Sequence, residues 1–433
     1  MSNNKADNIE RQPMVVVIMV LIMRLVIGGT FIFSGFVKAI DPWGTMYKVT
    51  EYLMTLGWEA MAEQALFIAF ALPVIELLLG VAILFGAYRR SAPIAVLVMM
   101  AFMLPLTLWL AKTNAVPDCG CFGDALVLTN WATFGKNVFL TLGAVFLLML
   151  GRKVPGVFGP AVQWMVMAAT FLATMAIALP GYFTQPMIDF RPYKLGTKLV
   201  SAQPSVSGDD YLFIYEKDGQ QHEFTIDSLP DEEDGWEYVT RYHARRPRGK
   251  VIVQTGNAED GIAIMDSEGN DVTVDVLADS RHTLLLLFPD LPTVGVVNSF
   301  ALNELTDAAM VTDVDVIGLT PATAEEIEQW KDNSMASYPI YNMDDSELKM
   351  IARGNPAVVY LEDGVISWKR TLGSLDSVTM PDHLVELADD YDADSIMTTL
   401  MLAYLAGMLA VLVINRSHLV VKRLFFKKKS TNN

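Results

Sequence analysis

Apolar residues gather into long runs along the chain and are separated by polar stretches. A run of about 20 residues with almost no charge can cross a hydrocarbon core as a helix, which satisfies its own backbone hydrogen bonds. Such runs occupy roughly residues 14–37, 66–87, 92–111, 134–151, 161–180 and 395–415. The pattern therefore predicts six transmembrane helices. The first run resembles a signal peptide, but it is too long and lacks a small-residue cleavage site.

The basic residues beside these runs predict the orientation, because Lys and Arg are retained on the cytoplasmic side. They lie between the second and third runs, between the fourth and fifth, and after the sixth (Arg89, Arg90, Arg152, Lys153, Arg416, Lys422, Arg423 and Lys427 to Lys429). With an even number of spans, both termini are then cytoplasmic in a bacterial inner membrane. Residues 38–65, 112–133 and 181–394 lie on the outer face, and about 183–394 is expected to be periplasmic.

The last outer segment has the pattern of a folded domain. Two strand-like runs, Tyr211 to Tyr215 and His222 to Ile226, flank a Lys-Asp-Gly-Gln turn and predict a hairpin. From about residue 251, strand-like and helix-like runs alternate, which predicts an α/β layer with a partly parallel sheet. The strands are Val251 to Gln254, Thr283 to Phe288, Val314 to Leu319 and Ala357 to Leu361, and the helices are Val297 to Ala309, Ala322 to Asp332 and Ser346 to Ala352.

Composition narrows the set of partners. The chain of 433 residues is 52% hydrophobic and carries a net charge of -17. Because binding to phosphates requires clustered Lys and Arg, this charge argues against nucleic acid as a partner. We interpret the acidic residues, which lie mainly between about 205 and 395, as a solvated surface. The partner that the apolar runs imply is the lipid bilayer.

The only two cysteines, Cys119 and Cys121, lie in a short loop between two predicted spans. Gly120 allows a turn tight enough to bring the sulfurs together, and the outer face permits a disulfide. The pair is therefore a candidate catalytic site for thiol–disulfide exchange, or a pair of thiolates for a soft metal; the alternative is a structural turn. Metal is disfavoured, since two sulfurs leave a tetrahedral site short of ligands. Lys112 would favour a thiolate, whereas Asp118 and Asp124 would oppose it.

Ionisable residues within the predicted spans are costly unless they face the bundle interior or each other. Arg24 in the first span and Glu76 in the second are therefore candidate site residues, with an internal ion pair that fixes helix packing as the alternative. Lys38 and Asp41 are further candidates, although both could simply anchor the helix at the interface. A stretch of small residues on the first span predicts close helix packing (Gly28, Gly29, Ser34 and Gly35).

The first third of the chain resembles the DoxX family in its branch of methylamine-utilisation MauE proteins. The resemblance rests on three elements: Arg24-Leu-Val-Ile-Gly28 with Phe31 to Pro42; Leu72 to Glu76 with Leu79-Gly80; and Asp118-Cys-Gly-Cys-Phe-Gly-Asp124. It implies a four-helix membrane bundle. MauE members of the family are associated with maturation of a disulfide-rich dehydrogenase subunit, and other relatives with thiosulfate and quinone chemistry.

The outer domain resembles a thioredoxin-like fold. Thr283 to Phe288 corresponds to the strand before the active-site turn, and Arg353-Gly-Asn-Pro356 to the loop whose proline such folds hold cis. Pro289 to Gly295 stands where a Cys-x-x-Cys would open the helix, and it contains no thiol. A domain without a thiolate cannot perform thioredoxin exchange, so the resemblance implies a binding or structural domain.

These observations divide the chain into a DoxX/MauE-like domain (1–155), a fifth span (156–182), a β-rich segment (183–280), a degenerate thioredoxin-like domain (281–394) and a sixth span with a basic tail (395–433). One hypothesis is an oxidoreductase or redox partner, with electrons passing to a membrane quinone or a soluble dithiol. The other is a scaffold or maturation factor that binds an extracytoplasmic client and has a static cysteine pair. A transporter has little support, because the spans show no paired broken helices.

Overall fold

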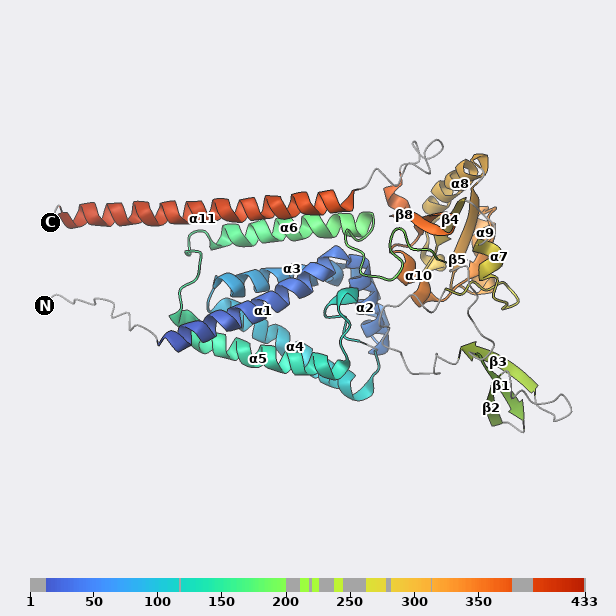
Figure 1. Cartoon of the computed structure of the whole chain (residues 1–433), viewed down its shortest axis with the longest axis horizontal. Coiled ribbons are helices and arrows are strands. Elements are labelled where there is room, and N and C mark those ends of the chain that lie inside the picture. Colours follow the sequence, from blue (N-terminus) through green and yellow to red (C-terminus); the bar gives the residue numbers. More distant parts are fainter. Residues whose placement is uncertain are drawn as a thin grey trace.

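A computed structural model describes residues 13–116, 118–199, 211–217, 220–225, 237–243, 262–277, 282–312, 314–375 and 392–431. Within these residues, six helices are long and apolar enough to cross a membrane. They lie side by side as a bundle, and an α/β domain stands at one end of it (Figure 1). The chain is therefore a multi-pass membrane protein with an α/β domain, as the hydrophobic pattern predicts.

The six spans coincide with the predicted runs. They are α1 (Met14–Ile40), the 3-10 turn η1 (Glu59–Gln64) with α3 (Ala65–Phe85), α4 (Ser91–Thr113), α5 (Asn130–Leu150) with η3 (Gly151–Lys153), α6 (Gln163–Phe183), and the apolar part of α11 (Ala393–Thr431). Two shorter elements connect them: α2 (Pro42–Thr55) follows α1, and η2 (Gly123–Ala125) follows the cysteines. At about 1.5 Å per residue, α11 is longer than a bilayer is thick, so its C-terminal part extends beyond the apolar core.

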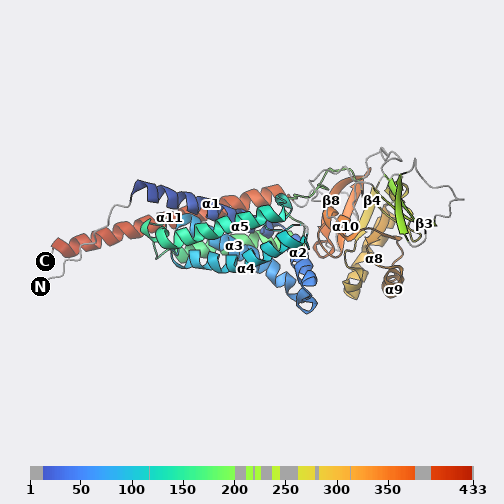
Figure 2. The same cartoon turned by 90° about the horizontal axis from the view of Figure 1, so that it is seen from below.

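The two ends of the bundle differ. At one end, α2 runs across the bundle next to the α/β domain, and we call this the domain-facing end (Figures 1 and 2). At the opposite end α1 begins and α11 ends. The basic connectors meet there too, since Arg89 donates a hydrogen bond to the carbonyl of Arg152 (3.0 Å). Because α1 begins and α11 ends at the same end of the bundle, the arrangement agrees with the expected even number of spans.

The first and second spans, α1 and α3, pack through glycines. A Cβ on Gly28 would lie 2.9 Å from the carbonyl oxygen of Gly80, and one on Gly35 would lie 2.8 Å from Leu77. The backbones therefore approach as closely as small residues allow. The prediction that all four small residues pack is wrong for Gly29, whose Cβ would have nothing within 4 Å. Ser34 is buried and also donates a hydrogen bond.

The α/β domain is built on a mixed sheet. Among the described residues, its strand order is β6-β5-β4-β7-β8, in which β4, β5 and β6 are parallel and β7 and β8 are antiparallel to their neighbours. The peptide bond between Asn355 and Pro356, just before β7, is cis. The strands are β4 (His282–Leu287), β5 (Asp315–Thr320), β6 (Ile340–Asn342), β7 (Ala357–Glu362) and β8 (Val365–Thr371).

Helices cover both faces of this sheet, so its central strands are apolar on both sides. Leu284 and Leu286 of β4 pack toward α8 and α9, whereas Leu285 and Leu287 pack toward α10. A strand that is buried on both faces reads as a continuous apolar run, which explains the Leu-Leu-Leu-Leu sequence. The remaining elements are α7 (Thr273–Leu277), η7 (Leu291–Thr293), α8 (Val296–Val311), α9 (Ala324–Ser334), α10 (Asp345–Ile351) and η8 (Leu372–Ser374).

The segment after α6 connects the bundle to the mixed sheet through backbone hydrogen bonds with β8. Residues 196–199 run along the free edge of β8, where Gly196 and Leu199 donate backbone hydrogen bonds to Ile366 (2.8 Å) and Gly364 (2.9 Å). Backbone N–H groups of Thr371 and Ile366 donate back to the same segment. Because this pairing covers an open sheet edge, it fixes the domain close to the end of the fifth span.

A small antiparallel sheet stands apart from the mixed one, with strand order β2-β1-β3 among the described residues. Its strands are β1 (Tyr211–Lys217), β2 (Gln220–Thr225) and β3 (Glu237–His243). The predicted hairpin is confirmed by the pairing of β1 with β2. The predicted strand Val251 to Gln254 lies outside the described residues.

Adjacent glycines on α1 provide a matched test of the α1–α3 contact. We expect Gly28→Ala to lower the stability of the detergent-solubilised protein by about 1–3 kcal/mol, because the added methyl group collides with α3. Gly29→Ala should leave it unchanged or raise it slightly. Thermal unfolding followed by tryptophan fluorescence measures both, and equal effects from the two variants would contradict the packing.

Candidate functional site

The two cysteines lie in a tight turn at the domain-facing end of the bundle. Gly120, between them, has a positive φ of 63°, a conformation that glycine adopts without strain. The Asp118 carboxylate accepts a hydrogen bond from the Gly120 N–H (2.6 Å) and so closes the turn. As a result the Cys119 and Cys121 sulfurs are 2.7 Å apart, so that only a small movement separates two thiols from a bonded pair.

The turn rests on a buried polar network beneath it. Lys38 of α1 donates hydrogen bonds to the Cys121 carbonyl (2.8 Å), to Ser34 (2.7 Å) and to both oxygens of Glu76 on α3 (2.9 Å each). Ser34 donates in turn to the same Cys121 carbonyl (2.6 Å). Lys38 and Glu76 are 6% and 5% exposed, so the pair is a true buried ion pair. The network joins two spans to the backbone of the cysteine turn.

Helix α2 covers the turn from the other side. Tyr52 donates a hydrogen bond to the Cys119 carbonyl (3.1 Å), and Lys48 pairs with Asp118 (3.3 Å) and Glu51 (2.9 Å). A Cβ on Gly120 would lie 2.6 Å from the Lys48 side chain, so that side chain lies directly over the turn. Cys119 is consequently buried, whereas Cys121 is half-buried.

The two thiols differ in acidity. The Cys119 and Cys121 thiols share a hydrogen bond, which lowers the pKa of Cys121 to about 6, with further lowering by Lys136 and Lys38. The same hydrogen bond, together with burial, raises the pKa of Cys119. Cys121 is therefore the more acidic thiol of the pair, and as a residue it is less buried than Cys119.

The four intramembrane candidates separate into different roles. Lys38 does not anchor α1 at the interface, because it is buried against Glu76. The internal ion pair that was the alternative for Glu76 forms with Lys38 and not with Arg24. Arg24 lies at the other end of the bundle. It donates hydrogen bonds to the carbonyls of Gly151 (2.9 Å), Val154 (2.8 Å) and Pro155 (3.0 Å) after α5. Carbonyls at a helix C-terminus lack intrahelical partners, so Arg24 closes that end of the bundle.

Asp41 is the fourth candidate, and its role involves both domains. It accepts a hydrogen bond from the Gly44 N–H (2.8 Å) at the start of α2 and forms an ion pair with Arg353 of the α/β domain (2.7 Å). Arg353 also pairs with Asp124 (2.6 Å), just after the cysteine turn. Sequence reasoning did not single out Arg353, Ser34, Tyr52 or Lys136 as parts of this site, since their contacts join distant segments.

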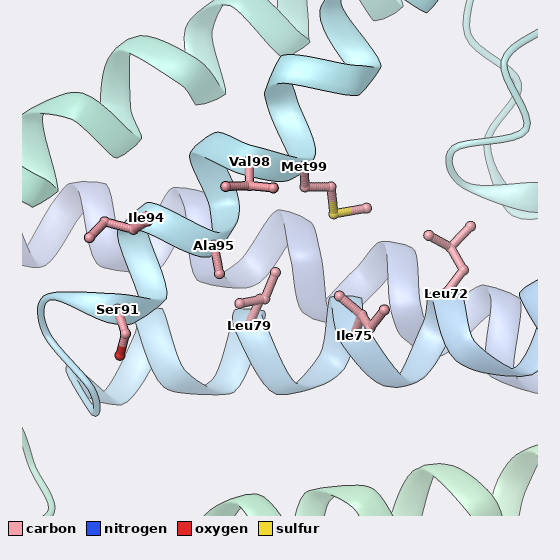
Figure 3. Close-up of a pocket in the computed structure, with 8 residues that line it drawn as sticks. All are labelled: Leu72, Ile75, Leu79, Ser91, Ile94, Ala95, Val98 and Met99. Carbon is pink, nitrogen blue, oxygen red and sulfur yellow. The ribbon is translucent and has the colours of Figure 1, made fainter.

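An apolar groove opens elsewhere, on the side of the bundle between α3 and α4 (Figure 3). Its volume is about 590 Å³, and side chains of the two helices point into it (Leu72, Ile75, Leu79, Ser91, Ile94, Ala95, Val98 and Met99). None of these lining residues is ionisable. The groove suits a hydrocarbon chain.

The buried ion pair predicts an asymmetric response to substitution. Lys38→Met leaves Glu76 as an unpaired buried carboxylate and should destabilise the protein by about 3–5 kcal/mol. The double variant Lys38→Met, Glu76→Met removes both charges and should recover most of this loss. Chemical denaturation in detergent measures the free energies of unfolding, and a double variant that is no more stable than Lys38→Met would contradict the pairing.

Comparison with known families agrees with the arrangement of the first spans. Residues 16–150 match the family described as Methylamine utilisation protein MauE, and residues 210–244 match a Domain of unknown function (DUF8463). A search of curated proteins found no match to the chain. The first match includes α1 to α5, the Lys38–Glu76 pair and the cysteine turn. The chain is therefore a multi-pass membrane protein that contains a MauE domain at residues 16–150.

Proposed function

We propose that the chain is a thiol–disulfide exchange protein of the bacterial inner membrane, in which Cys121 is the attacking thiolate and Cys119 resolves the intermediate. The observation that carries the proposal is the pair itself. Two free thiols lie 2.7 Å apart, one half-buried with a lowered pKa and one buried with a raised pKa. This asymmetry is the one expected of an exchanging pair.

The exchange takes place in two steps. The Cys121 thiolate attacks a disulfide of a partner protein, forms a mixed disulfide and releases the first partner thiolate. That thiolate accepts the proton of Cys119, whose sulfur then attacks Cys121 and releases the second partner sulfur. The products are the Cys119–Cys121 disulfide and the partner dithiol, so two electrons move to the partner. The reverse sequence oxidises a client dithiol.

Lys38 and Lys136 supply the electrostatics of this chemistry. Both ammonium groups lower the pKa of Cys121, and Lys38 is fixed by its bonds to Glu76 and to the Cys121 carbonyl. A cation that is held in place costs no reorganisation when the thiolate forms. The same fixed contacts keep the turn at the domain-facing end, which the basic connectors at the opposite end indicate to be the periplasmic side.

The electron partner that this site favours is a soluble dithiol protein. The cysteine turn lies outside the apolar helices, beside α2 and the α/β domain. The groove between α3 and α4 offers a quinone headgroup only the Ser91 hydroxyl as a polar side chain. A protein client that reaches the turn from the aqueous side therefore fits better than a membrane quinone.

The α/β domain is, in our proposal, a thioredoxin-like domain that serves this site without a thiol of its own. Its parallel strands β4 and β5, its antiparallel hairpin β7–β8 and its helices on both faces support that assignment. The loop where a Cys-x-x-Cys would stand is tied to Asn355, which donates hydrogen bonds to Asp290 (2.8 Å) and Thr293 (3.0 Å). The domain would present clients to the membrane pair.

A second candidate function is a client-binding scaffold with a static cysteine pair. The observation in its favour is the burial of Cys119 beneath α2, where Tyr52 and Lys48 cover the turn. A covered thiol exchanges slowly with partners, whatever its pKa.

Single serine variants distinguish the two functions. In cells treated with acid to trap thiols, Cys119→Ser should accumulate a mixed disulfide between Cys121 and its partner, because the resolving thiol is gone. Cys121→Ser should accumulate several-fold less, since Cys119 is buried and protonated. The adducts are read on non-reducing gels, and their partners by mass spectrometry. The variant that lacks both thiols is the control.

The scaffold function, with a static cysteine pair, predicts the opposite result. If neither single variant forms adducts while both are present at normal levels in the membrane, exchange through this pair is excluded. Equal adducts on both variants would contradict the assignment of Cys121 as the nucleophile.

A further inference from the structure

Arg353 of the α/β domain forms ion pairs with two residues of the bundle domain. Its guanidinium contacts Asp41 (2.7 Å), Asp124 (2.6 Å) and the Lys349 carbonyl (2.5 Å), and it lies 5.7 Å from the centre of the Tyr47 ring. Its backbone exchanges two hydrogen bonds with Gln185 (2.6 and 3.0 Å). The residue is 5% exposed. Burial lowers the pKa of Arg353, but the Asp41 and Asp124 carboxylates raise it by a larger amount, so the net shift is upward.

The two carboxylates that Arg353 binds belong to two segments next to the cysteine turn. Asp124 follows Cys121 by three residues and begins the segment that leads to α5. Asp41 caps the N-terminus of α2, the helix whose Lys48 and Tyr52 cover the turn. One guanidinium therefore fixes both the exit of the turn and the helix above it.

Gly44 of α2 leaves room for this guanidinium. A Cβ on Gly44 would lie 2.9 Å from the Arg353 side chain and 2.4 Å from Asp41. A larger residue at the first turn of α2 would therefore displace Arg353 from Asp41. Tyr47, one turn later on α2, contacts the same domain through Lys349, whose ammonium lies 4.6 Å from the ring centre.

We propose that Arg353 is a positioning residue for the Cys119–Cys121 pair, acting from the α/β domain through Asp124 and Asp41. The inference rests on the proposed exchange function and deepens it. It gives the thiol-free domain a part in the chemistry, because that domain supplies the cation that neutralises Asp124 beside the turn. The same cation holds α2 in place over the turn through Asp41.

The charges around Cys121 explain why this cation matters. Lys38 and Lys136 favour the thiolate from α1 and α5, while Glu76 opposes it from α3. Within the turn, Asp118 is already paired with Lys48 of α2, and Asp124 is paired with Arg353. Without Arg353, the Asp124 carboxylate, three residues after Cys121 and half-exposed, loses this ion-pair partner, and we expect its charge to disfavour a thiolate on Cys121.

The test uses the full-length reduced protein in detergent and measures the alkylation rate of Cys121 against pH, with the modified sulfur identified by tandem mass spectrometry. In the wild type, the rate should rise through about pH 6 as the thiolate forms, and stay level above it. Arg353→Gln should move this midpoint upward by roughly half a pH unit or more. Adding Asp124→Asn to Arg353→Gln should return the midpoint toward the wild-type value.

Two variants in the α/β domain serve as controls. Arg191→Gln disturbs another buried ion pair, with Asp189 (2.7 Å), and Lys331→Gln removes an exposed pair with Glu328 (3.2 Å). Neither residue contacts the turn, so both variants should keep the wild-type midpoint.

An unchanged midpoint in Arg353→Gln overturns the proposal. A shift that Asp124→Asn does not reverse, or that Arg191→Gln reproduces, also overturns it, because the effect would then reflect domain stability alone. The outcome is separable from that of the exchange function. A midpoint that responds as expected, with no mixed disulfides in the serine variants, would retain the positioning role and reject the exchange.

Discussion

The ammonium group of Lys38 is the interaction on which the rest of the site depends. It lies among apolar helices where an isolated charge is expensive, and three kinds of acceptor compensate for this cost: the Glu76 carboxylate, the Ser34 hydroxyl and the Cys121 carbonyl. The first of these joins α1 to α3, and the last joins both helices to the cysteine turn. The position of the turn is therefore set by the need to satisfy a buried charge.

Helix α2 connects this membrane site to the α/β domain. Lys48 and Tyr52 face the cysteine turn, while Gly44 and Tyr47 face Arg353 and α10. This short helix therefore contacts both the domain and the turn. The MauE-type bundle and the appended domain thus share one element at the point where the chemistry is proposed.

Much of the fold follows from local sequence pattern, whereas the site does not. Apolar runs predict the six spans, and the Leu284 to Leu287 run predicts a strand buried on both faces. The short edge strand β6 has too few residues for a periodic signal. The cysteine turn is visible because Gly120 and two cysteines stand together in sequence.

The residues that contact the cysteine turn could not be predicted from local sequence pattern, and the reason is physical. Lys38 and Glu76 are 38 residues apart, and Arg353 and Asp41 are 312 apart, so no local periodicity links them. For the same reason, local pattern does not show that Glu76 pairs with Lys38 while Arg24 lies at the other end of the bundle. Arg24 is satisfied by backbone carbonyls after α5, and backbone acceptors carry no sequence signature.

The central claim is that the cysteine pair cycles between two redox states, and the most direct measurement is its state in living cells. Thiols are trapped with a mass-shifting maleimide before, during and after a brief pulse of dithiothreitol. Our account predicts that the pair is reduced during the pulse and re-oxidised within minutes of its removal, with both forms present at steady state. A pair that stays in one state throughout would contradict it.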